Sequence, residues 1–430
     1  MTIAELYSIY LSHPVITTDS RNCPPGSLFF ALKGERFDGH AFAENALQAG
    51  CAYAVVENSE RFDDKRVIVV DNVLSTLHQL AHYHRKKLNI PVIGITGTNG
   101  KTTTKELTAA VLSKLYNTLY TLGNYNNHLG VPLTLLRLTA EHEIAVIEMG
   151  ANHPGEIGVL AAIAAPDYGL ITNVGYAHLE GFGSFEGVIK TKGELYEYVR
   201  KTNGTIFIHQ DNNYLTGIVG DVNQITYGTL SVNQPFIGGK ITGLHPFLSF
   251  LWQYRQDEMY KVDTNLVGGY NLWNAMAAIA IGVTFRVSPD KINEAIAHYE
   301  PTNNRSQLKK TAFNELIIDA YNANPSSMQA AIENFSTSTS SPKAVILGDM
   351  LELGDKSLEL HDAIVRQVET YRFDKVLLCG EQFTHTGQQY PCFPTVEQLN
   401  EYLCINPLQG YQILIKGSHG IHLERTLDRL

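Results

Sequence analysis

The chain has 430 residues, of which 44% are hydrophobic, and its formal net charge is −10 at neutral pH. This length predicts about three domains with packed cores. A negative chain without any block of Lys or Arg argues against nucleic-acid binding, because phosphate neutralisation needs a basic face. We expect no membrane insertion and a cytoplasmic protein, because the sequence has no signal-type start, no long apolar run and five scattered cysteines typical of reduced thiols.

Residues 1–88 are predicted to form a small α/β domain. Its expected strands and helix are 28–32, 53–56, 67–70 and 74–87. A second domain is predicted for residues 89–304, where apolar runs alternate with helical segments, as in a parallel sheet covered by helices. The clearest buried strands of that sheet are 90–96, 144–149 and 169–174.

The most informative segment follows the strand at 90–96 and opens a predicted helix. It reads G-x-x-G-K-T, because Ile95 stands where the usual phosphate loop has its first glycine. Backbone N–H groups would face phosphates, Lys101 would add a positive charge, and a threonine hydroxyl could ligate Mg²⁺. The Lys-Thr-Thr run disfavours a plain glycine-rich turn. The predicted phosphate loop comprises Gly97, Thr98, Asn99, Gly100, Lys101, Thr102 and Thr103.

Two side chains follow the neighbouring predicted strands. Glu148 ends an apolar run, so its carboxylate would project from the sheet edge beside the phosphate loop, where a Mg²⁺ ligand is needed. His178 follows the next strand and is expected to contact metal or phosphate. A strand-terminal Glu is often only solvated and a lone His is often structural, so the loop upstream is what favours a functional interpretation.

Asparagines form two further candidate groups. Asn124, Asn126 and Asn127 lie in an Asn- and Gly-rich segment, which is either a turn cluster or a loop that meets peptide and phosphate oxygens. Asn271 and Asn274 precede an alanine-rich helix. One of them is expected to be its N-cap, and the other could contact a base edge.

Three basic residues have a simple structural alternative. Lys190 and Lys192 lie in a predicted helix, where two exposed lysines would be ordinary. Because they are two positions apart, they should occupy different faces of that helix. Arg305 could pair with phosphate or carboxylate, although a lone loop arginine is more often solvated.

A third α/β domain is predicted for residues 305–430. Its expected strands are 316–319, 344–347, 375–379 and 413–415. Polar residues directly follow each of these strands, and open α/β sheets bind ligands at the carboxyl ends of their strands. We therefore expect this domain to contribute ligand contacts as well.

These segments, in this order, resemble the ATP-dependent Mur ligase family over nearly the whole chain, and the shortened phosphate loop matches the family's own form. The more selective signatures are Gly123 to Asn127, Asp319 to Met328 and Leu347 to Gly354. They are most similar to the branch that joins D-alanyl-D-alanine to UDP-N-acetylmuramoyl-tripeptide. The D-N-P-R sequence typical of the diaminopimelate-adding branch is absent. The resemblance implies a P-loop ATPase domain in the centre and a Rossmann-like C-terminal domain.

The resemblance also implies roles for individual residues. In the first domain, the candidate contacts to the uridine diphosphate end of the substrate are Ser20, Arg21, Arg36, Asp38 and His40. In the central domain, Lys101 would contact the phosphates of ATP, and the expected Mg²⁺ site comprises Thr102, Glu148, His178 and Lys192, the last as a carbamate. The expected ATP contacts also include Asn271 and Asn274 at adenine and Arg305 and Asp319 at ribose or phosphate. Tyr321, Asn322 and Lys416 would face the dipeptide or the acyl phosphate.

The implied reaction has two steps. The terminal carboxylate of the tripeptide attacks the γ-phosphorus of ATP, and the amine of D-alanyl-D-alanine then displaces phosphate from the acyl phosphate. Because ligands come from two domains, we expect the domains to close on binding. The expected catalytic residues are Lys101, Lys192 and His178.

Two other functions fit part of the pattern. A related amide ligase such as folylpolyglutamate synthetase would carry its phosphate loop near the chain start, whereas this loop follows a full N-terminal domain. A nucleotide-gated, non-enzymatic module would not release phosphate in response to a nucleotide-sugar peptide and an amine. A monomer is sufficient for the predicted activity, and the third residue of the acceptor peptide, lysine or diaminopimelate, is left open.

Overall fold

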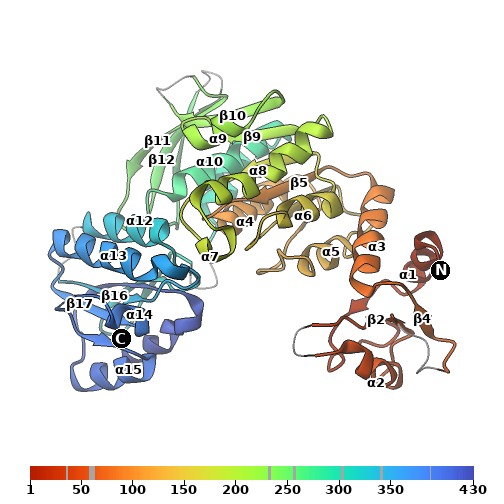
Figure 1. The fold of residues 1–430 in the computed structure, drawn as a ribbon. Helices are drawn as coiled ribbons and strands as arrows, with labels where there is room; N and C mark the ends of the chain where they lie inside the picture. Colours follow the sequence, from red (N-terminus) through yellow and green to blue (C-terminus); the bar gives the residue numbers. More distant parts are fainter. Residues whose placement is uncertain are drawn as a thin grey trace.

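The computed structural model describes residues 1–34, 37–57, 63–230, 234–254, 258–301, 305–338, 342–387 and 389–430. Three separate sheets follow one another along the chain, and helices accompany each of them. Figure 1 shows the central domain lying between the N-terminal and C-terminal domains. The predicted three-domain α/β fold is therefore confirmed.

The N-terminal sheet has four parallel strands in chain order. They are β1 (Ile16–Thr17), β2 (Leu28–Phe30), β3 (Tyr53–Val56) and β4 (Val67–Val69). The accompanying helices are α1 (Ile3–Ser12), α2 (Ala43–Gln48) and α3 (Val73–Leu88). Helix α3 packs on α5 and α6 of the central domain, so the apolar core is continuous between the two domains.

The central sheet has nine strands in the order β13-β12-β11-β10-β9-β8-β5-β7-β6. Its strands are β5 (Val92–Thr96), β6 (Thr118–Tyr120), β7 (Ile144–Glu148), β8 (Tyr168–Ile171), β9 (Thr205–His209), β10 (Asn223–Thr229), β11 (Ile237–Gly243), β12 (Ser249–Tyr254) and β13 (Met259–Asp263). The predicted parallel arrangement holds from β6 to β11. Strands β11, β12 and β13 add an antiparallel extension that was not predicted, in which each strand pairs with the next one along the chain.

Both faces of the central sheet are buried around β5, β7 and β8. Along β7, Ala145 and Ile147 join the core on one face, and Ile144 and Val146 join the core on the other. The helices of this domain are α4 (Lys101–Leu112), α5 (Gly130–Leu135), α6 (Glu156–Ala164), α7 (Leu179–Phe182), α8 (Phe185–Lys201), α9 (Asn213–Ile218), α10 (Asn271–Thr284) and α11 (Pro289–Ala297). This burial on both sides explains why the strands read as continuous apolar runs in the sequence.

The C-terminal sheet has six strands in the order β14-β15-β19-β16-β17-β18, parallel except for β14. They are β14 (Gln307–Lys310), β15 (Glu315–Asp319), β16 (Lys343–Gly348), β17 (Lys375–Cys379), β18 (Cys392–Phe393) and β19 (Gln412–Lys416). The helices are α12 (Pro325–Ser336), α13 (Ser357–Tyr371), α14 (Glu381–Thr384) and α15 (Val396–Ile405). Because β15 and β19 are parallel neighbours, Asp319 and Lys416 end beside each other at one sheet edge.

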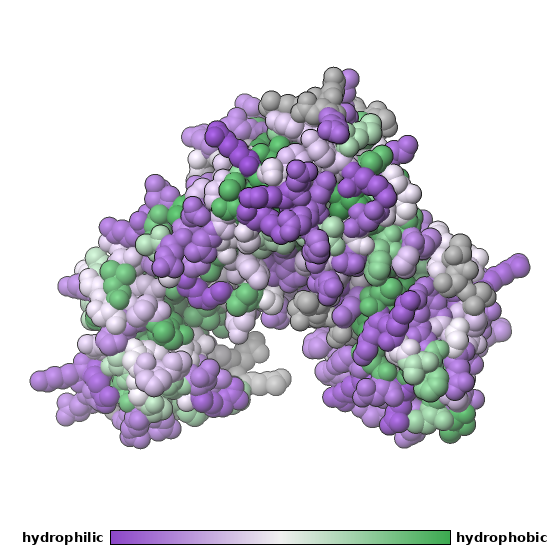
Figure 2. Space-filling model, turned by 180° about the vertical axis from the view of Figure 1, so that it is seen from behind, coloured by the Kyte–Doolittle hydropathy of each residue, from purple (hydrophilic) through white to green (hydrophobic). Residues whose placement is uncertain are grey.

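The space-filling view shows the N-terminal and C-terminal domains as two lobes with open space between them below the central domain (Figure 2). No helix in the described part of the chain combines the length and the apolar character that a bilayer crossing requires. All five cysteines are free, as predicted.

Candidate active site

A cavity of about 1230 Å³ lies where the three domains meet, beside the predicted phosphate loop. Helix α3 contributes Leu74 and His78 to its wall, and the remaining lining residues come from the central and C-terminal domains. Most of the predicted site residues line this cavity. They are Thr98, Asn99, Gly100, Lys101, Thr102, Thr103, Asn124, Asn126, Asn127, Glu148, His178, Asn271, Asn274, Arg305, Asp319, Tyr321, Asn322 and Lys416.

The phosphate loop connects β5 to α4 as predicted, and two of its glycines are required by their surroundings. Gly97 has φ 144° and a Cβ there would lie 2.0 Å from Thr172 Oγ1. Gly100 has φ 77° and a Cβ there would lie 2.4 Å from Asn274 Oδ1. Any other residue would be strained and would collide with a neighbour. The loop therefore depends on glycine at both positions.

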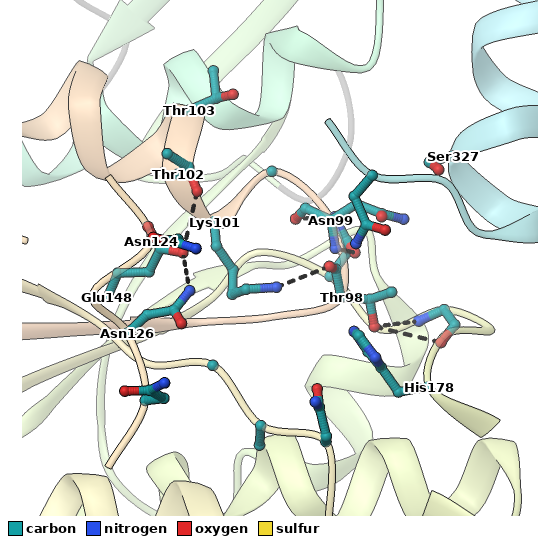
Figure 3. A pocket seen from close by; sticks show the side chains of 18 of the residues that line it. Thr98, Asn99, Lys101, Thr102, Thr103, Asn124, Asn126, Glu148, His178 and Ser327 are labelled. Atoms are coloured by element: carbon teal, nitrogen blue, oxygen red, sulfur yellow. Dashed lines mark hydrogen bonds between the residues drawn. The ribbon is translucent and has the colours of Figure 1, made fainter. Parts of the chain in front are cut away.

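Lys101 is the first residue of α4 and is half-buried at the cavity. Its ammonium donates hydrogen bonds to the carbonyl oxygens of Gly97 at 2.8 Å and Thr98 at 3.0 Å. Burial lowers the pKa of Lys101 to about 8, although the charge of Glu148 opposes this shift. The lysine is thus held over the loop, as Figure 3 shows.

Glu148 ends β7 at the cavity with only 1% of its surface exposed. Its Oε1 accepts hydrogen bonds from the Thr102 hydroxyl at 3.1 Å and from the Asn126 amide at 2.8 Å (Figure 3). Its Oε2 is buried without a hydrogen-bond partner. A buried carboxylate with an unused oxygen beside a threonine hydroxyl has the ligand chemistry that Mg²⁺ prefers, so these residues fit the expected ion.

His178 lies at the start of α7 with φ 49°, and it reaches a different domain. Its Nδ1 contacts the Glu352 carboxylate of the C-terminal domain, and this hydrogen bond lowers the pKa of Glu352. In Figure 3, Glu148 and His178 lie on either side of the Lys101 side chain. Within the described ranges, no three His, Cys, Asp or Glu side chains converge into a preformed metal cluster.

Lys192 and Lys190 differ as helix periodicity predicts. On α8, Lys190 is exposed, whereas only 2% of Lys192 is exposed. The Lys192 ammonium donates to the carbonyl oxygen of Ala151, which lines the cavity, at 3.4 Å. Burial, reinforced by the positive charge of Lys101, lowers the pKa of Lys192 to about 7. A large share of this amine is therefore neutral near neutral pH.

The prediction that Asn271 or Asn274 caps α10 is wrong. The helix begins at Asn271, its N-cap is Tyr270, and no side chain makes a capping bond. Asn271 instead donates to the carbonyl oxygen of Val267 at 2.8 Å, and Asn274 donates to Asn271 Oδ1 at 2.8 Å. Both side chains are buried, so their amide groups form hydrogen bonds within the protein and do not cap the helix.

The predicted C-terminal residues converge at the ends of β15 and β19. Lys416 Nζ lies 2.6 Å from Asp319 Oδ2, and it also donates to the Asn322 carbonyl oxygen at 3.2 Å. The Arg305 guanidinium stacks on the Tyr321 ring, 3.7 Å from its centroid. Arg305 Nε is buried without a hydrogen-bond partner, so it is an unused donor at the cavity.

Two contacts between the central and C-terminal domains beside the phosphate loop were not predicted. Asn324, the N-cap of α12, donates from its amide to Asn99 Oδ1 at 2.7 Å. The Ser326 hydroxyl accepts from the Tyr176 backbone N–H at 3.2 Å. Both C-terminal residues lie within the signature from Asp319 to Met328, but their partners are 150 or more positions away. The signature singled out the segment that contains these two residues, but their contacts are evident only from the fold.

Four of the five predicted N-terminal residues are described, and none of these four lines the cavity. Arg21 is exposed and pairs with Asp19 at 2.8 Å, and Ser20 lies beside it. Asp38 caps the turn that contains His40, whose other ring nitrogen accepts from the Glu57 backbone N–H at 3.0 Å. Arg36 lies outside the described residues. The contact to the far end of a nucleotide-linked substrate stays a prediction for these positions.

Comparison with known proteins accounts for this arrangement. Three family models match in succession: Mur ligase family, catalytic domain, at residues 14–97, Mur ligase middle domain at 95–282, and Mur ligase, glutamate ligase domain, at 304–419. The UDP-N-acetylmuramoyl-tripeptide–D-alanyl-D-alanine ligase of Escherichia coli strain K12 is 35% identical, over 99% of this chain and 95% of the relative. The chain belongs to the Mur ligase family.

Solved structures agree with this assignment. The crystal structure of MurF from Acinetobacter baumannii superposes on this Mur ligase with a TM-score of 0.88 and 32% identity, covering 96% of this chain and 92% of that one. MurF ligase from Thermotoga maritima, solved in complex with ADP, gives a TM-score of 0.87 and 27% identity, covering 97% of each chain. The resemblance inferred from the sequence motifs is therefore confirmed.

Proposed function

We propose that this Mur ligase uses ATP to join D-alanyl-D-alanine to UDP-N-acetylmuramoyl-tripeptide through an acyl phosphate, in peptidoglycan precursor synthesis. The observation that carries the proposal is the convergence of Lys101, Glu148 and Arg305 on one cavity between domains. Relatives of this activity match nearly the whole chain. In this proposal the enzyme acts as a monomer in the cytoplasm.

The phosphate loop binds the triphosphate of ATP. Backbone N–H groups of the loop and the N-terminus of α4 face the phosphates, and Lys101 adds a charge at the β- and γ-phosphates. Asn271 and Asn274 line the same cavity, and we assign them to the adenine. Thr102 and Glu148 would hold Mg²⁺, which offsets the phosphate charge when bound.

The first step brings together two anions, the tripeptide carboxylate and the triphosphate of ATP. Positively charged groups must therefore lie close to both of them. The tripeptide carboxylate attacks the γ-phosphorus of ATP, a bond forms from the carboxylate oxygen to phosphorus, and ADP leaves. Lys101 stabilises the charge that develops on the phosphoryl group, and Arg305 offers a buried, unpaired N–H from the C-terminal domain.

In the second step the amine of D-alanyl-D-alanine attacks the acyl carbonyl, and phosphate leaves with the original carboxylate oxygen. We assign Tyr321, Asn322 and Lys416 to this side of the cavity, next to the incoming dipeptide or acyl phosphate. Asn124, Asn126 and Asn127 would meet the peptide from the central domain. Asp319 orients Lys416 through their ion pair at 2.6 Å.

Lys192 is assigned as a carbamate in the working enzyme. Its neutral amine adds to CO₂ and loses one proton, which replaces a cation with a carboxylate-like anion that can ligate Mg²⁺. The depressed pKa of Lys192 supports this assignment, because only the neutral amine reacts with CO₂. His178 would lie next to the same ion and the γ-phosphate.

An amine screen tests the proposal. ADP formation is measured with ATP, Mg²⁺ and the UDP-linked tripeptide, and with D-alanyl-D-alanine, D-glutamate, L-lysine or diaminopimelate as the amine. Among these amines, we expect only D-alanyl-D-alanine to give fast turnover. We expect no turnover when either the tripeptide or the amine is left out. Faster turnover with a single amino acid would place the chain in another branch, and ADP release that ignores both substrates would favour a nucleotide-gated module.

A further inference from the structure

Lys105 is a completely buried lysine one helical turn beyond Lys101 on α4, and its exposed fraction is 0%. Its ammonium donates to the Thr121 carbonyl oxygen at 2.8 Å, and it is not among the residues that line the cavity. Burying an ammonium group is costly unless opposite charges surround it, and a methionine would fill similar space at lower cost. The position of this charge therefore needs an explanation.

Two carboxylates flank the Lys105 ammonium. Glu106 Oε1 lies 3.4 Å from it, and Glu148 Oε2 lies 3.9 Å from it. The two oxygens of Glu148 have different surroundings: Oε1 is bonded to Thr102 and Asn126, whereas Oε2 has no hydrogen-bond partner. Lys105 thus balances Glu148 at the oxygen that has no other partner, and it does so from outside the lining of the cavity.

Glu148 needs such a partner because Mg²⁺ is a temporary neighbour in the proposed reaction. In the proposed reaction Glu148 would hold the ion only while nucleotide is bound, and a buried carboxylate left without a counter-charge is strongly destabilising. Lys101 is less suited to this task, because its ammonium bonds the loop carbonyls and serves the phosphates. Lys105 has no exposed surface and does not line the cavity, so its charge stays in place throughout the cycle.

We propose that Lys105 is the resident counter-ion of Glu148. It is a positioning residue that keeps the carboxylate balanced and in place between turnovers, and its repulsion of Mg²⁺ weakens ion binding enough for release with ADP. This inference rests on the proposed function, because it takes Glu148 as a Mg²⁺ ligand. Lys105 itself contacts neither substrate nor metal.

The test measures thermal unfolding of the full chain with ADP across a Mg²⁺ titration. Without Mg²⁺, Lys105→Met should unfold at a lower temperature than wild type, because Glu148 loses its counter-charge. Its Mg²⁺ midpoint should fall by about tenfold, since the ion no longer meets a like charge. In ligation assays, kcat should fall at saturating Mg²⁺ while the KM for the amine is unchanged, because release of ADP becomes slower.

Tyr299→Phe is the matched control. The Tyr299 hydroxyl donates to Glu106 Oε2 at 2.6 Å, so this change disturbs the neighbourhood of Lys105 without touching Glu148. It should lower the unfolding temperature and leave the Mg²⁺ midpoint unchanged. An unchanged or higher Mg²⁺ midpoint in Lys105→Met would overturn the inference, since Lys105 would then serve only packing or only orientation.

Two further variants separate this inference from the proposed function. If Glu148→Gln leaves the Mg²⁺ response intact, Glu148 is not a ligand and that part of the proposed function fails. If Glu148→Gln abolishes the response but Lys105→Met does not shift it, only the counter-ion inference fails. Should Lys105→Met not fold, the double variant Lys105→Met with Glu148→Gln decides. It should be more stable than Lys105→Met alone, and an equally unstable double variant would contradict the pairing.

Discussion

The N-terminal and C-terminal domains contact the central domain in chemically different ways. On the N-terminal side, apolar residues of α3 such as Leu77 and Leu80 share one core with α5 and α6. Buried Arg85 adds hydrogen bonds to the carbonyl oxygens of Ala164 and Ala165 and an ion pair with Asp167 at 2.8 Å. Separating these domains would expose apolar surface and a buried charge.

On the C-terminal side, three contacts made by the phosphate loop and by the segment that follows β8 are polar. They are the pairs Asn99 with Asn324, Tyr176 with Ser326, and His178 with Glu352. Each of these groups can exchange its partner for water at small net cost. Val267 of the central domain also joins the apolar core of the C-terminal domain, so the polar character is confined to the contacts beside the phosphate loop. We therefore predict that the N-terminal interface stays closed, and that the polar contacts beside the phosphate loop are the ones that can separate.

The largest expected effect concerns the phosphate loop at the polar interface. Lys101→Ala should lower kcat/KM for ligation on the order of 10³-fold, because the lysine stabilises charge in the transition state. The fold should persist, since Lys101 is half-buried and makes only two bonds to its own loop. Circular dichroism checks the fold and ADP release checks the rate. Normal turnover in a folded variant would refute the ATP site.

Lys192→Ala should reduce activity by about 10²-fold, since a carbamate ligand is lost, and a small carboxylate such as formate should restore part of it. The exposed Lys190→Ala is the control and should stay within about twofold. Burial and Lys101 lower the pKa of Lys192 to about 7, so the neutral amine fraction rises as pH increases through that value. The carbamate signal in ¹³C-bicarbonate NMR should rise from pH 6 to 8. A missing signal together with near-normal activity of Lys192→Ala would contradict the assignment.

At the apolar interface, stability should change rather than catalysis. Leu80 has an exposed fraction of 0%, so Leu80→Ala should cost about 2–5 kcal/mol of unfolding free energy. Activity per folded molecule should stay within about twofold. Chemical denaturation and active-site titration measure the two quantities. A large loss of activity without loss of stability would show that this interface also moves during catalysis.

The smallest effect is expected for Glu352→Gln. Its partner His178 and Glu352 itself are both partly exposed, with side-chain exposure of 22% and 52%, so the contact contributes on the order of 1 kcal/mol. We expect about a threefold to tenfold rise in KM for ATP and a more open average shape in small-angle X-ray scattering. Unfolding temperature should hardly change. An unchanged KM and an unchanged scattering profile would mean that this pair does not hold the domains together.

The sequence predicted those parts of the site that depend on neighbouring residues. The phosphate loop, Glu148 at a strand end and the separate faces of Lys190 and Lys192 follow from glycine spacing, apolar runs and helix periodicity. Each of these signals lies within about twenty residues of chain, the scale on which local propensity acts.

Local sequence patterns do not predict contacts between distant segments of the chain. Nothing near Asn99 indicates that Asn324, 225 positions away, will bond to it. Lys105 reads as an ordinary helix residue until the fold brings Thr121 and Glu148 around it. Asn271 or Asn274 was expected to cap a helix, but the Asn271 amide donates to the carbonyl oxygen of Val267, four residues earlier. For Asn99 and Lys105, a partner far away in the sequence decides the role.

The central claim is that the tripeptide carboxylate is activated by phosphoryl transfer in the cavity between the central and C-terminal domains. The direct test is ligation with a UDP-linked tripeptide whose terminal carboxylate carries ¹⁸O at both oxygens. Mass spectrometry of the released inorganic phosphate should find one ¹⁸O atom per phosphate, because the carboxylate oxygen leaves with phosphorus. Unlabelled phosphate, formed at the same rate as the amide product, would contradict the account.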